Sequence, residues 1–157
     1  MISGIIKAEK IHVSNIVSTI NRKDHDYAIY GKHKRTLDEI EAEIHLWRVV
    51  TASDGQPLAF VRVHLVNWLS RTVKYSIVFS SDSDKVKILY RVLLDLFETY
   101  NCSKLTTDII YDRSDTIKDH IFLGSNIEVR NRQHLYLNGK YAHVVEMAIF
   151  QNELKNE

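Results

Sequence analysis

The chain carries eight histidines and one cysteine, the side chains that most often bind a metal or act as nucleophiles. The histidines are scattered, and none forms a His-x-x-x-His pair or a Cys/His cluster with the ligand spacing of a zinc site. Cys102 follows Asn101 at a predicted helix end, beside the negative pole of the helix dipole, where a thiolate is disfavoured. No Gly-x-Ser-x-Gly elbow, Walker loop or dinucleotide fingerprint occurs. We therefore predict no metal site and no nucleophile of a familiar kind.

Residues 22–35 are basic and rich in His, with Tyr27 and Tyr30 among them, a composition that suits stacking on nucleic acid. Asp24 and Asp26 interrupt the stretch, and the whole chain balances 21 Lys and Arg against 20 Asp and Glu. A net charge of +1 gives no field that would attract nucleic acid or a membrane surface. We expect neither partner, and a solvated loop is the simpler interpretation of this stretch.

A length of 157 residues suits one domain, so we predict a single domain over residues 1–157. No apolar run approaches the roughly 20 residues that span a bilayer. Residues 1–10 mix Lys7, Glu9 and Lys10 with isoleucines, unlike a signal peptide. A lone cysteine also suits a reducing compartment, and a cytoplasmic location is the expectation.

The elements that must position any site follow from apolar spacing. Helical spacing predicts helices over residues 13–20, 36 to about 47, 84–101 and 114–123; the end of the second is left open between residues 45 and 52. Thr36 and Glu39 form a capping box, and Leu37 belongs to the predicted buried stripe of that helix. Alternation predicts strands over residues 2–8, 59–65, 73–79, 104–111, 127–137 and 140–150, with Asn138-Gly139 as the last hairpin turn. The strand over 59–65 is expected to be half-buried.

With a strand before residue 53, the predicted order is β-α-α-β-β-β-α-β-α-β-β, an α/β (α+β) chain with a mixed sheet. Four segments in this order resemble the GNAT N-acetyltransferase family. They are Gly-Gln-Pro-Leu-Ala-Phe at 55–60, Val-Lys-Tyr-Ser-Ile-Val-Phe at 73–79, Leu-Leu-Asp-Leu-Phe-Glu at 93–98, and residues 134–147. The last is similar to the terminal hairpin of the branch that modifies ribosomal protein N-termini and amino-sugars. The resemblance covers residues 36–150.

The resemblance implies the GNAT fold with a central splayed mixed sheet. It also implies direct transfer of an acyl group from acetyl-CoA, or another acyl-CoA, to a primary amine of a small molecule, amino-sugar or peptide, without a metal. Backbone amides at Ile77, Val78 and Phe79 would polarise the thioester carbonyl where the fourth strand leaves the fifth. In this family the terminal strands often pair between subunits, so a homodimer is a further expectation.

The family writes the pyrophosphate loop as Gln/Arg-x-x-Gly-x-Gly/Ala, and this chain has Ser-Ser-Asp-Ser-Asp-Lys-Val at 80–86. Asp82 and Asp84 fall at or beside the glycine positions, where each carboxylate would repel a phosphate by about 1 kcal/mol. Helix capping explains the Ser and Asp residues fully and is the favoured interpretation, and a solvated helix face explains the lysines equally well. The cofactor-binding residues that the resemblance predicts here are Ser83, Lys85, Val86 and Lys87.

A second family motif is Asn-x-x-Ser followed by a Tyr before a helix-ending Gly. Counting back from Gly124 places Arg113 and Thr116 at the first two positions, as cofactor contacts, and His120 at the Tyr position. An imidazolium at His120 would protonate the leaving thiolate, and an inert surface histidine is the alternative. The alternative for Arg113 is simple exposure.

Candidate general bases are Asp108, Glu128 and Glu146, and we favour Asp108 and Glu146. Glu146 stands in an apolar strand, where burial would raise its pKa. The competing interpretation is an ion pair across the hairpin with Arg130, Arg132 or Lys140.

The acidic loop also supports a second hypothesis. A GNAT-fold chain that has lost its coenzyme A site would act as a ligand-binding or interaction module, or would take the acyl group from a carrier protein.

Overall fold

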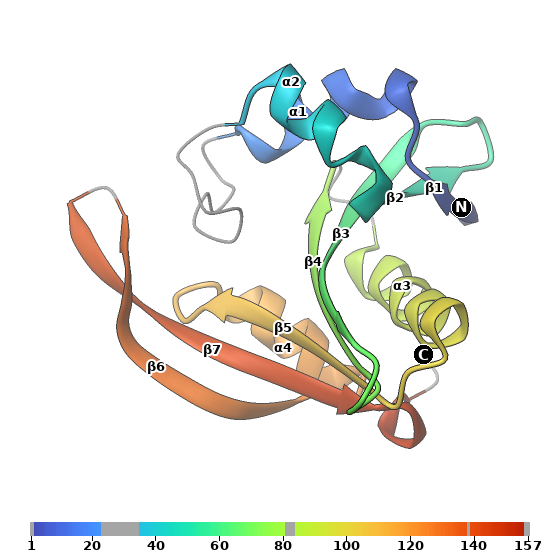
Figure 1. Ribbon diagram of the computed structural model, residues 1–157. Coiled ribbons are helices and arrows are strands. Elements are labelled where there is room, and N and C mark those ends of the chain that lie inside the picture. Colours follow the sequence, from blue (N-terminus) through green and yellow to red (C-terminus); the bar gives the residue numbers. More distant parts are fainter. Residues whose placement is uncertain (1, 23–34, 81–83, 138, 156–157) are drawn as a thin grey trace. The chain divides into compact units, whose positions relative to one another are not determined.

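The computed structural model describes residues 2–22, 35–80, 84–137 and 139–155 (Figure 1). The predicted order of helices and strands is confirmed, and short 3-10 turns are added at Lys10–His12, Ile44–Leu46 and Gln151–Glu153. The elements are β1 Ile2–Lys7, α1 Val13–Ile20, α2 Leu37–Ala42, β2 Trp47–Ala52, β3 Pro57–Asn67, β4 Thr72–Phe79, α3 Lys85–Tyr100, β5 Lys104–Ile110, α4 Ser114–Phe122, β6 Asn126–Leu137 and β7 Lys140–Phe150. The strands form one mixed sheet in the order β1-β2-β3-β4-β5-β7-β6.

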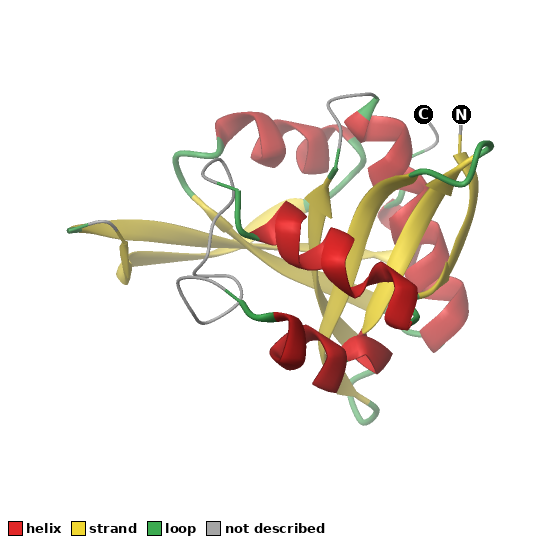
Figure 2. Cartoon of the chain, turned by 90° about the horizontal axis from the view of Figure 1, so that it is seen from above, coloured by secondary structure: helices red, strands yellow, loops and turns green. Residues whose placement is uncertain are grey.

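Contacts divide the chain into two compact units, one within residues 1–64 and 76–84, the other within residues 65–75 and 85–157. In the first unit, α1 and α2 cover one face of the strands (Figure 2). Ile16 and Ile20 of α1, Ile40 of α2 and Phe60 of β3 are each at most 1% exposed and share one core. Val13, Ile16 and Ile20 have the helical spacing that predicted α1, and all three are buried in this core.

The second helix is shorter than predicted. Thr36 caps it as expected, with its hydroxyl accepting the Glu39 amide at 3.2 Å. The helix ends at Ala42, however, and Trp47 begins β2. A helix of six residues cannot carry a stripe from the first turn to Trp47, and Leu37 is 54% exposed rather than buried.

The strand over 59–65 also differs from the prediction. Ala59, Phe60 and Val61 are all at most 1% exposed, so β3 is buried on both faces at this point instead of one. Leu65, which the alternation placed inward, is 60% exposed. Period-two spacing predicts the strand but does not reveal whether a second layer covers its other face.

In the second unit, α4 lies against β5 and β7 (Figure 1). Ile117 packs there with Ile109, Val145 and Met147. In helix α3, Val86 and Tyr90 are only partly buried. Its buried residues are Ile88, Leu89, Val92, Leu93, Leu96 and Phe97.

Gly124 ends α4, as predicted. Its φ is +113°, and a Cβ at this position would lie 2.2 Å from the backbone oxygen of Glu153. Both the left-handed conformation and the close approach require glycine. The backbone of the C-terminal 3-10 turn, Gln151–Glu153, is therefore packed directly on the end of α4.

None of the helices in the described ranges is both long enough and apolar enough to cross a membrane.

Candidate functional site

Strands β4 and β5 run parallel but pair over only three residues, from Thr72 with Lys104 to Lys74 with Thr106. Strand β4 continues to Phe79, while β5 pairs with β7 along all seven of its residues. Within the described chain, Ile77, Val78 and Phe79 therefore make no ladder with β5. A ladder continued to Phe79 would have left no main-chain groups for a ligand at these residues.

The predicted pyrophosphate loop is only partly described, because Ser83 and Asp82 lie outside the described residues. Lys85, Val86 and Lys87 form the first turn of α3. Lys85 has an acidic neighbour in α4: burial raises the pKa of the Asp119 carboxyl, and the Lys85 charge opposes that rise. Some of the positive charge at the start of α3 is thus directed at a protein carboxylate.

Arg113 and Thr116 stand at the start of α4. Arg113 is the N-cap residue and is partly buried, with its carbonyl accepting the Ile117 amide at 3.1 Å. Thr116 is also partly buried, and its carbonyl faces the ring of His120 one turn later. Their predicted contacts with a cofactor stay predictions.

His120 is buried, at 1% exposure, and is not the surface histidine of the alternative interpretation. Its Nδ1 lies 2.7 Å from the Thr116 carbonyl. A carbonyl only accepts, so the proton is on Nδ1, and Nε2 holds a lone pair that has no partner in the described part of the chain. Burial lowers the pKa of His120 to about 4.

At pH 7, roughly one molecule in a thousand would therefore carry the imidazolium that our proposed proton donation needs. The neutral ring presents an acceptor, not a donor, at Nε2. A catalytic role for His120 stays a prediction. In its neutral form the ring can accept a hydrogen bond from a bound ligand at Nε2, but it cannot donate a proton from Nε2 to a thiolate.

Tyr75 is the neighbour that the sequence did not single out. Its ring stacks on His120 at 6.4 Å between centroids and 22° between planes. The side chain is 1% exposed, and burial raises the pKa of its phenol, so the O–H group stays protonated at neutral pH. The alternation in β4 predicted that Tyr75 faces inward, but nothing in the sequence paired it with His120.

The two favoured carboxylates come together. Asp108 of β5 and Glu146 of β7 are directly opposite in the antiparallel ladder. Lys74 of β4 lies 2.7 Å from Asp108 and 3.8 Å from Glu146. The side chain of Glu146 is 30% exposed and lies near a cation, as the ion-pair interpretation predicted, but that cation is Lys74 of β4 rather than a residue of the hairpin.

The third candidate base is separate from this pair. Glu128 accepts from Lys104 at 2.7 Å and is exposed on β6. Lys104 also lies 5.4 Å from the centre of the Phe150 ring. Glu128 is therefore held in a surface ion pair with Lys104.

A second polar cluster lies in the first unit and was not predicted. Glu43, 9% exposed, accepts from Arg35 through one oxygen and from Arg62 through the other, the latter at 2.6 Å. Arg62 continues to Nδ1 of His64 at 2.6 Å, and Nε2 of His64 lies 2.5 Å from the hydroxyl of Ser76.

This order of bonds decides the tautomer of His64. A guanidinium only donates, so Nδ1 accepts and the ring proton is on Nε2, pointing at Ser76. A histidine that activates a serine needs the reverse arrangement, with an unprotonated Nε2 accepting from the serine hydroxyl and Nδ1–H donating to a carboxylate. His64 and Ser76 are therefore as close as a general base and its nucleophile, but the proton on His64 Nε2 prevents the ring from taking a proton from the Ser76 hydroxyl.

In the described ranges no group of three or more His, Cys, Asp or Glu side chains has the arrangement to hold a metal ion.

No protein-family model matches the chain, and no curated protein does either. Solved structures do match in shape. A chimeric form of the spermidine N-acetyltransferase from Vibrio cholerae superposes with a TM-score of 0.82 at 17% identity, over 95% of each chain. That enzyme in complex with CoA and spermine gives 0.81 at 17% identity, over 96% of each chain. Its dodecameric structure gives 0.78 at 18% identity, over 95% of this chain and 94% of the other.

The likeness shows the fold: a mixed α/β chain with a seven-stranded sheet of the GNAT type, as the sequence predicted.

Proposed function

We propose that the chain is an acyl-CoA-dependent N-acyltransferase that acylates a primary amine of a small molecule. One observation carries the proposal: the parallel ladder between β4 and β5 stops after three pairs, although both strands continue. The pantetheine arm of acyl-CoA can then bind along Ile77, Val78 and Phe79 as an added strand. Amides of this segment would hydrogen-bond the thioester oxygen as charge develops on it.

The phosphates of the donor would meet the start of α3 and α4. Helix starts favour anions, and Lys85, Lys87, Arg113 and Thr116 remain the residues that we expect at this place, together with Ser83. Since the Lys85 charge also acts on Asp119, its contribution to phosphate binding is reduced.

The acceptor side is supported by Lys74. Its ammonium already lies between Asp108 and Glu146, so this carboxylate pair accommodates a primary alkylammonium. The similar enzyme from Vibrio cholerae is known in complex with CoA and spermine, a molecule with primary amines. We propose that an amine substrate binds by competing with Lys74 and loses a proton to Asp108 or Glu146 before it attacks.

The reaction is a direct transfer. The amine nitrogen bonds to the thioester carbon, the carbon–sulfur bond breaks, and coenzyme A leaves as a thiolate that takes up a proton. Tyr75 is protonated at neutral pH and His120 is not, so we expect Tyr75 to be the better source of that proton. The protonation of His64 argues against a covalent intermediate on Ser76.

Titration calorimetry with acetyl-CoA, followed by a coenzyme A release assay with spermine, an amino-sugar and a peptide amine, tests the proposal. We expect binding, and release with at least one amine. Tyr75→Phe should lower kcat by about 10²-fold or more, with His120→Gln as the matched variant on the other ring. Absence of heat at millimolar acetyl-CoA would rule out the acyl-CoA donor.

That negative result would favour the second hypothesis, a binding module or a transferase that uses an acyl-carrier protein. The Lys85 charge shared with Asp119 is the observation on its side. The same assay with an acyl-carrier protein as donor would distinguish the binding module, which gives no transfer, from the transferase that uses an acyl-carrier protein.

We also propose that the chain is cytoplasmic and that it assembles with copies of itself; the enzyme of similar fold from Vibrio cholerae has a dodecameric structure. The molar mass from light scattering, measured as the protein elutes from a size-exclusion column, tests the assembly.

A further inference from the structure

Lys74 is itself a primary amine, and it occupies the place at which a substrate amine is expected to bind. Its ammonium lies 2.7 Å from Asp108 and 3.8 Å from Glu146. A substrate amine must displace Lys74 from these two carboxylates. Until it does so, the amine nearest to the proposed acyl donor belongs to the protein.

The side chain of Lys74 extends toward the end at which β4 and β5 separate. In the parallel ladder Lys74 is paired with Thr106, and this is the last pair. The carboxylate that Lys74 contacts belongs to Asp108, two residues further along β5. Because two residues of a strand cover about 6–7 Å, the Lys74 side chain reaches past the last pair, in the direction of the gap in which the donor is proposed to bind.

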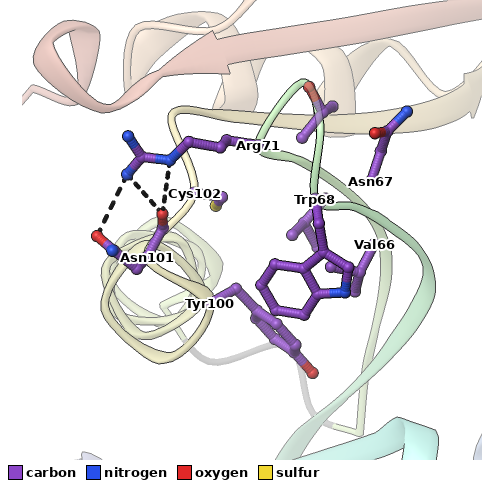
Figure 3. A pocket seen from close by; sticks show the side chains of 9 residues that line it. Val66, Asn67, Trp68, Arg71, Tyr100, Asn101 and Cys102 are labelled. Atoms are coloured by element: carbon purple, nitrogen blue, oxygen red, sulfur yellow. Dashed lines mark hydrogen bonds between the residues drawn. The ribbon is translucent and has the colours of Figure 1, made fainter.

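The backbone that carries Lys74 is held to the start of β5 by a clamp, in which Arg71 bonds to the loop that leads into β5 (Figure 3). The Arg71 guanidinium donates to the Asn101 carbonyl from Nε at 3.2 Å and from Nη2 at 2.7 Å (dashed in Figure 3). The Arg71 carbonyl accepts from the Ser103 amide at 2.8 Å. The position of Lys74 relative to β5 is therefore set before a donor arrives, and a nucleophile held in place reacts faster than a mobile one.

The same two carboxylates can take the proton that Lys74 must lose before it attacks. An amine is a nucleophile only in its uncharged form, so a base beside it is needed. The side chains of Asp108 and Glu146 are both partly exposed, so a proton that they accept can pass to water. Lys74 thus has a base, an exit for the proton and a direction toward the donor.

We propose, resting on the function proposed above, that Lys74 is a self-acylation site, modified by the bound acyl-CoA when no substrate amine is present. Lys74 gives one proton to Asp108, which releases it to water. The Lys74 nitrogen then bonds to the thioester carbon, the carbon–sulfur bond breaks, and the second proton that the nitrogen loses goes to the leaving thiolate. The products are Nε-acyl-Lys74, coenzyme A and one proton.

The modification changes the site for later substrates. The new amide is stable, so acyl-Lys74 is an end state and not an intermediate of the transfer. It carries no charge, and a substrate amine then binds Asp108 and Glu146 without displacing the Lys74 ammonium. We expect the modified chain to have a KM for its amine about threefold or more below that of the unmodified chain, as loss of a competing, partly exposed ion pair implies.

Peptide mapping by mass spectrometry tests the site after the full chain is incubated with acetyl-CoA and no amine. Lys104 is the matched lysine, because its ammonium also lies 2.7 Å from a carboxylate, that of Glu128. Lys104 begins β5, at the paired end of the ladder. We expect one acetyl group per chain, on Lys74, at a rate about tenfold or more above the rate at Lys104. In urea, where the chain is unfolded, the two rates should be nearly equal.

Asp108→Asn should slow the acylation of Lys74 by about 10²-fold, because it removes the group that takes the proton. Glu41→Gln removes the carboxylate partner of the exposed Lys10 and should leave the rate at Lys74 unchanged. If Asp108→Asn fails to fold, the ratio of the Lys74 and Lys104 rates in the parent, folded and in urea, answers the question without a variant.

Calorimetry with acetyl-CoA and coenzyme A release with the most active amine, measured on the same sample, separate this proposal from the transferase proposal. Turnover of the amine with Lys74 modified no faster than Lys104 would overturn self-acylation and leave the transferase standing. The same rate ratio in the folded and the unfolded chain would also overturn it. Neither binding nor modification would overturn both proposals. An unchanged KM after modification would overturn the competition between Lys74 and the substrate.

Discussion

The surroundings of His64 and His120 show two ways in which a fold treats a histidine. His64 has both ring nitrogens bonded, one to Arg62 and one to Ser76, inside a chain of charges that continues to Glu43. His120 has a single bond to the carbonyl of Thr116, and its Nε2 has no partner in the described part of the chain. Both nitrogens of the His64 ring are hydrogen-bonded, whereas the His120 ring has an acceptor, Nε2, to which no described residue donates.

The difference indicates that His64 has a structural role and that His120 is the better candidate for a functional one. A satisfied polar cluster stabilises the fold that contains it, whereas an unsatisfied buried atom costs stability and suggests a ligand. We therefore expect changes around His64 to appear in the stability of the protein. Changes at His120 should appear in its pH dependence and in ligand binding.

The largest effect should come from Arg62→Met. The change leaves Glu43 buried with one cation instead of two and takes the donor from His64. We expect the free energy of unfolding in urea to fall by about 3 kcal/mol. Lys10→Met, which removes the cation of an exposed pair with Glu41, should change it by less than about 0.5 kcal/mol. Similar losses in both variants would mean that the cluster is not stabilising.

The response of His120 to acid should be of similar size. Its pKa is about 4 in the folded chain against 6.5 for the free side chain. Between these values the unfolded state binds more protons, so stability falls as the pH drops from 6.5 to 4 and the loss levels off below 4. The expected total is about 3 kcal/mol.

His120→Leu should remove this part of the pH dependence, measured as the difference in urea midpoints between parent and variant from pH 7 to pH 4. The same slope in both proteins would show that the acid response comes from other groups.

A smaller loss is expected for Ser76→Ala, which removes the acceptor of the His64 Nε2–H bond. Ser76 is 4% exposed, so an unmet donor there should cost about 1 kcal/mol in thermal or urea unfolding. Ser18→Ala on the exposed face of α1 removes a hydroxyl of the same kind and should be nearly neutral. A neutral Ser76→Ala would mean that His64 finds another acceptor.

The smallest effect should be that of His120→Leu at pH 7. The variant loses the stacking on Tyr75 and the Nδ1–H bond to the Thr116 carbonyl, but it also loses an unmet buried lone pair, and these changes oppose each other. We expect the free energy of unfolding to stay within about 1 kcal/mol of the parent. A loss as large as that of Arg62→Met would erase the contrast between the two histidines.

The order of the elements was predictable because it depends on local patterns. Period-two strands, the Thr36 cap and the Asn138-Gly139 turn act within a few residues of each other, and all three predict elements at the observed places, although Asn138 itself is outside the described residues. Leu37 was wrong because the length of α2 depends on where Trp47 joins the sheet, which the helical spacing does not contain.

The polar pairings were not predictable for a related reason. Asp108 and Glu146 meet Lys74 only because β4, β5 and β7 are neighbours in the sheet, and strand order is set by contacts far apart in the chain. The spacing of Arg62 and His64 does place them on one face of β3. Nothing in that spacing brings Ser76 or Glu43 to them.

The backbone of Glu153 against Gly124 has a consequence for the order in which the chain is completed during translation. The end of α4, which carries His120, meets this contact only after β6 and β7 have both been synthesised, a delay on the order of seconds at ordinary ribosome speeds. During that interval the end of α4 lacks its contact with Glu153. We therefore expect the end of α4 to be the last part of the nascent protein at which chaperones still bind exposed apolar surface.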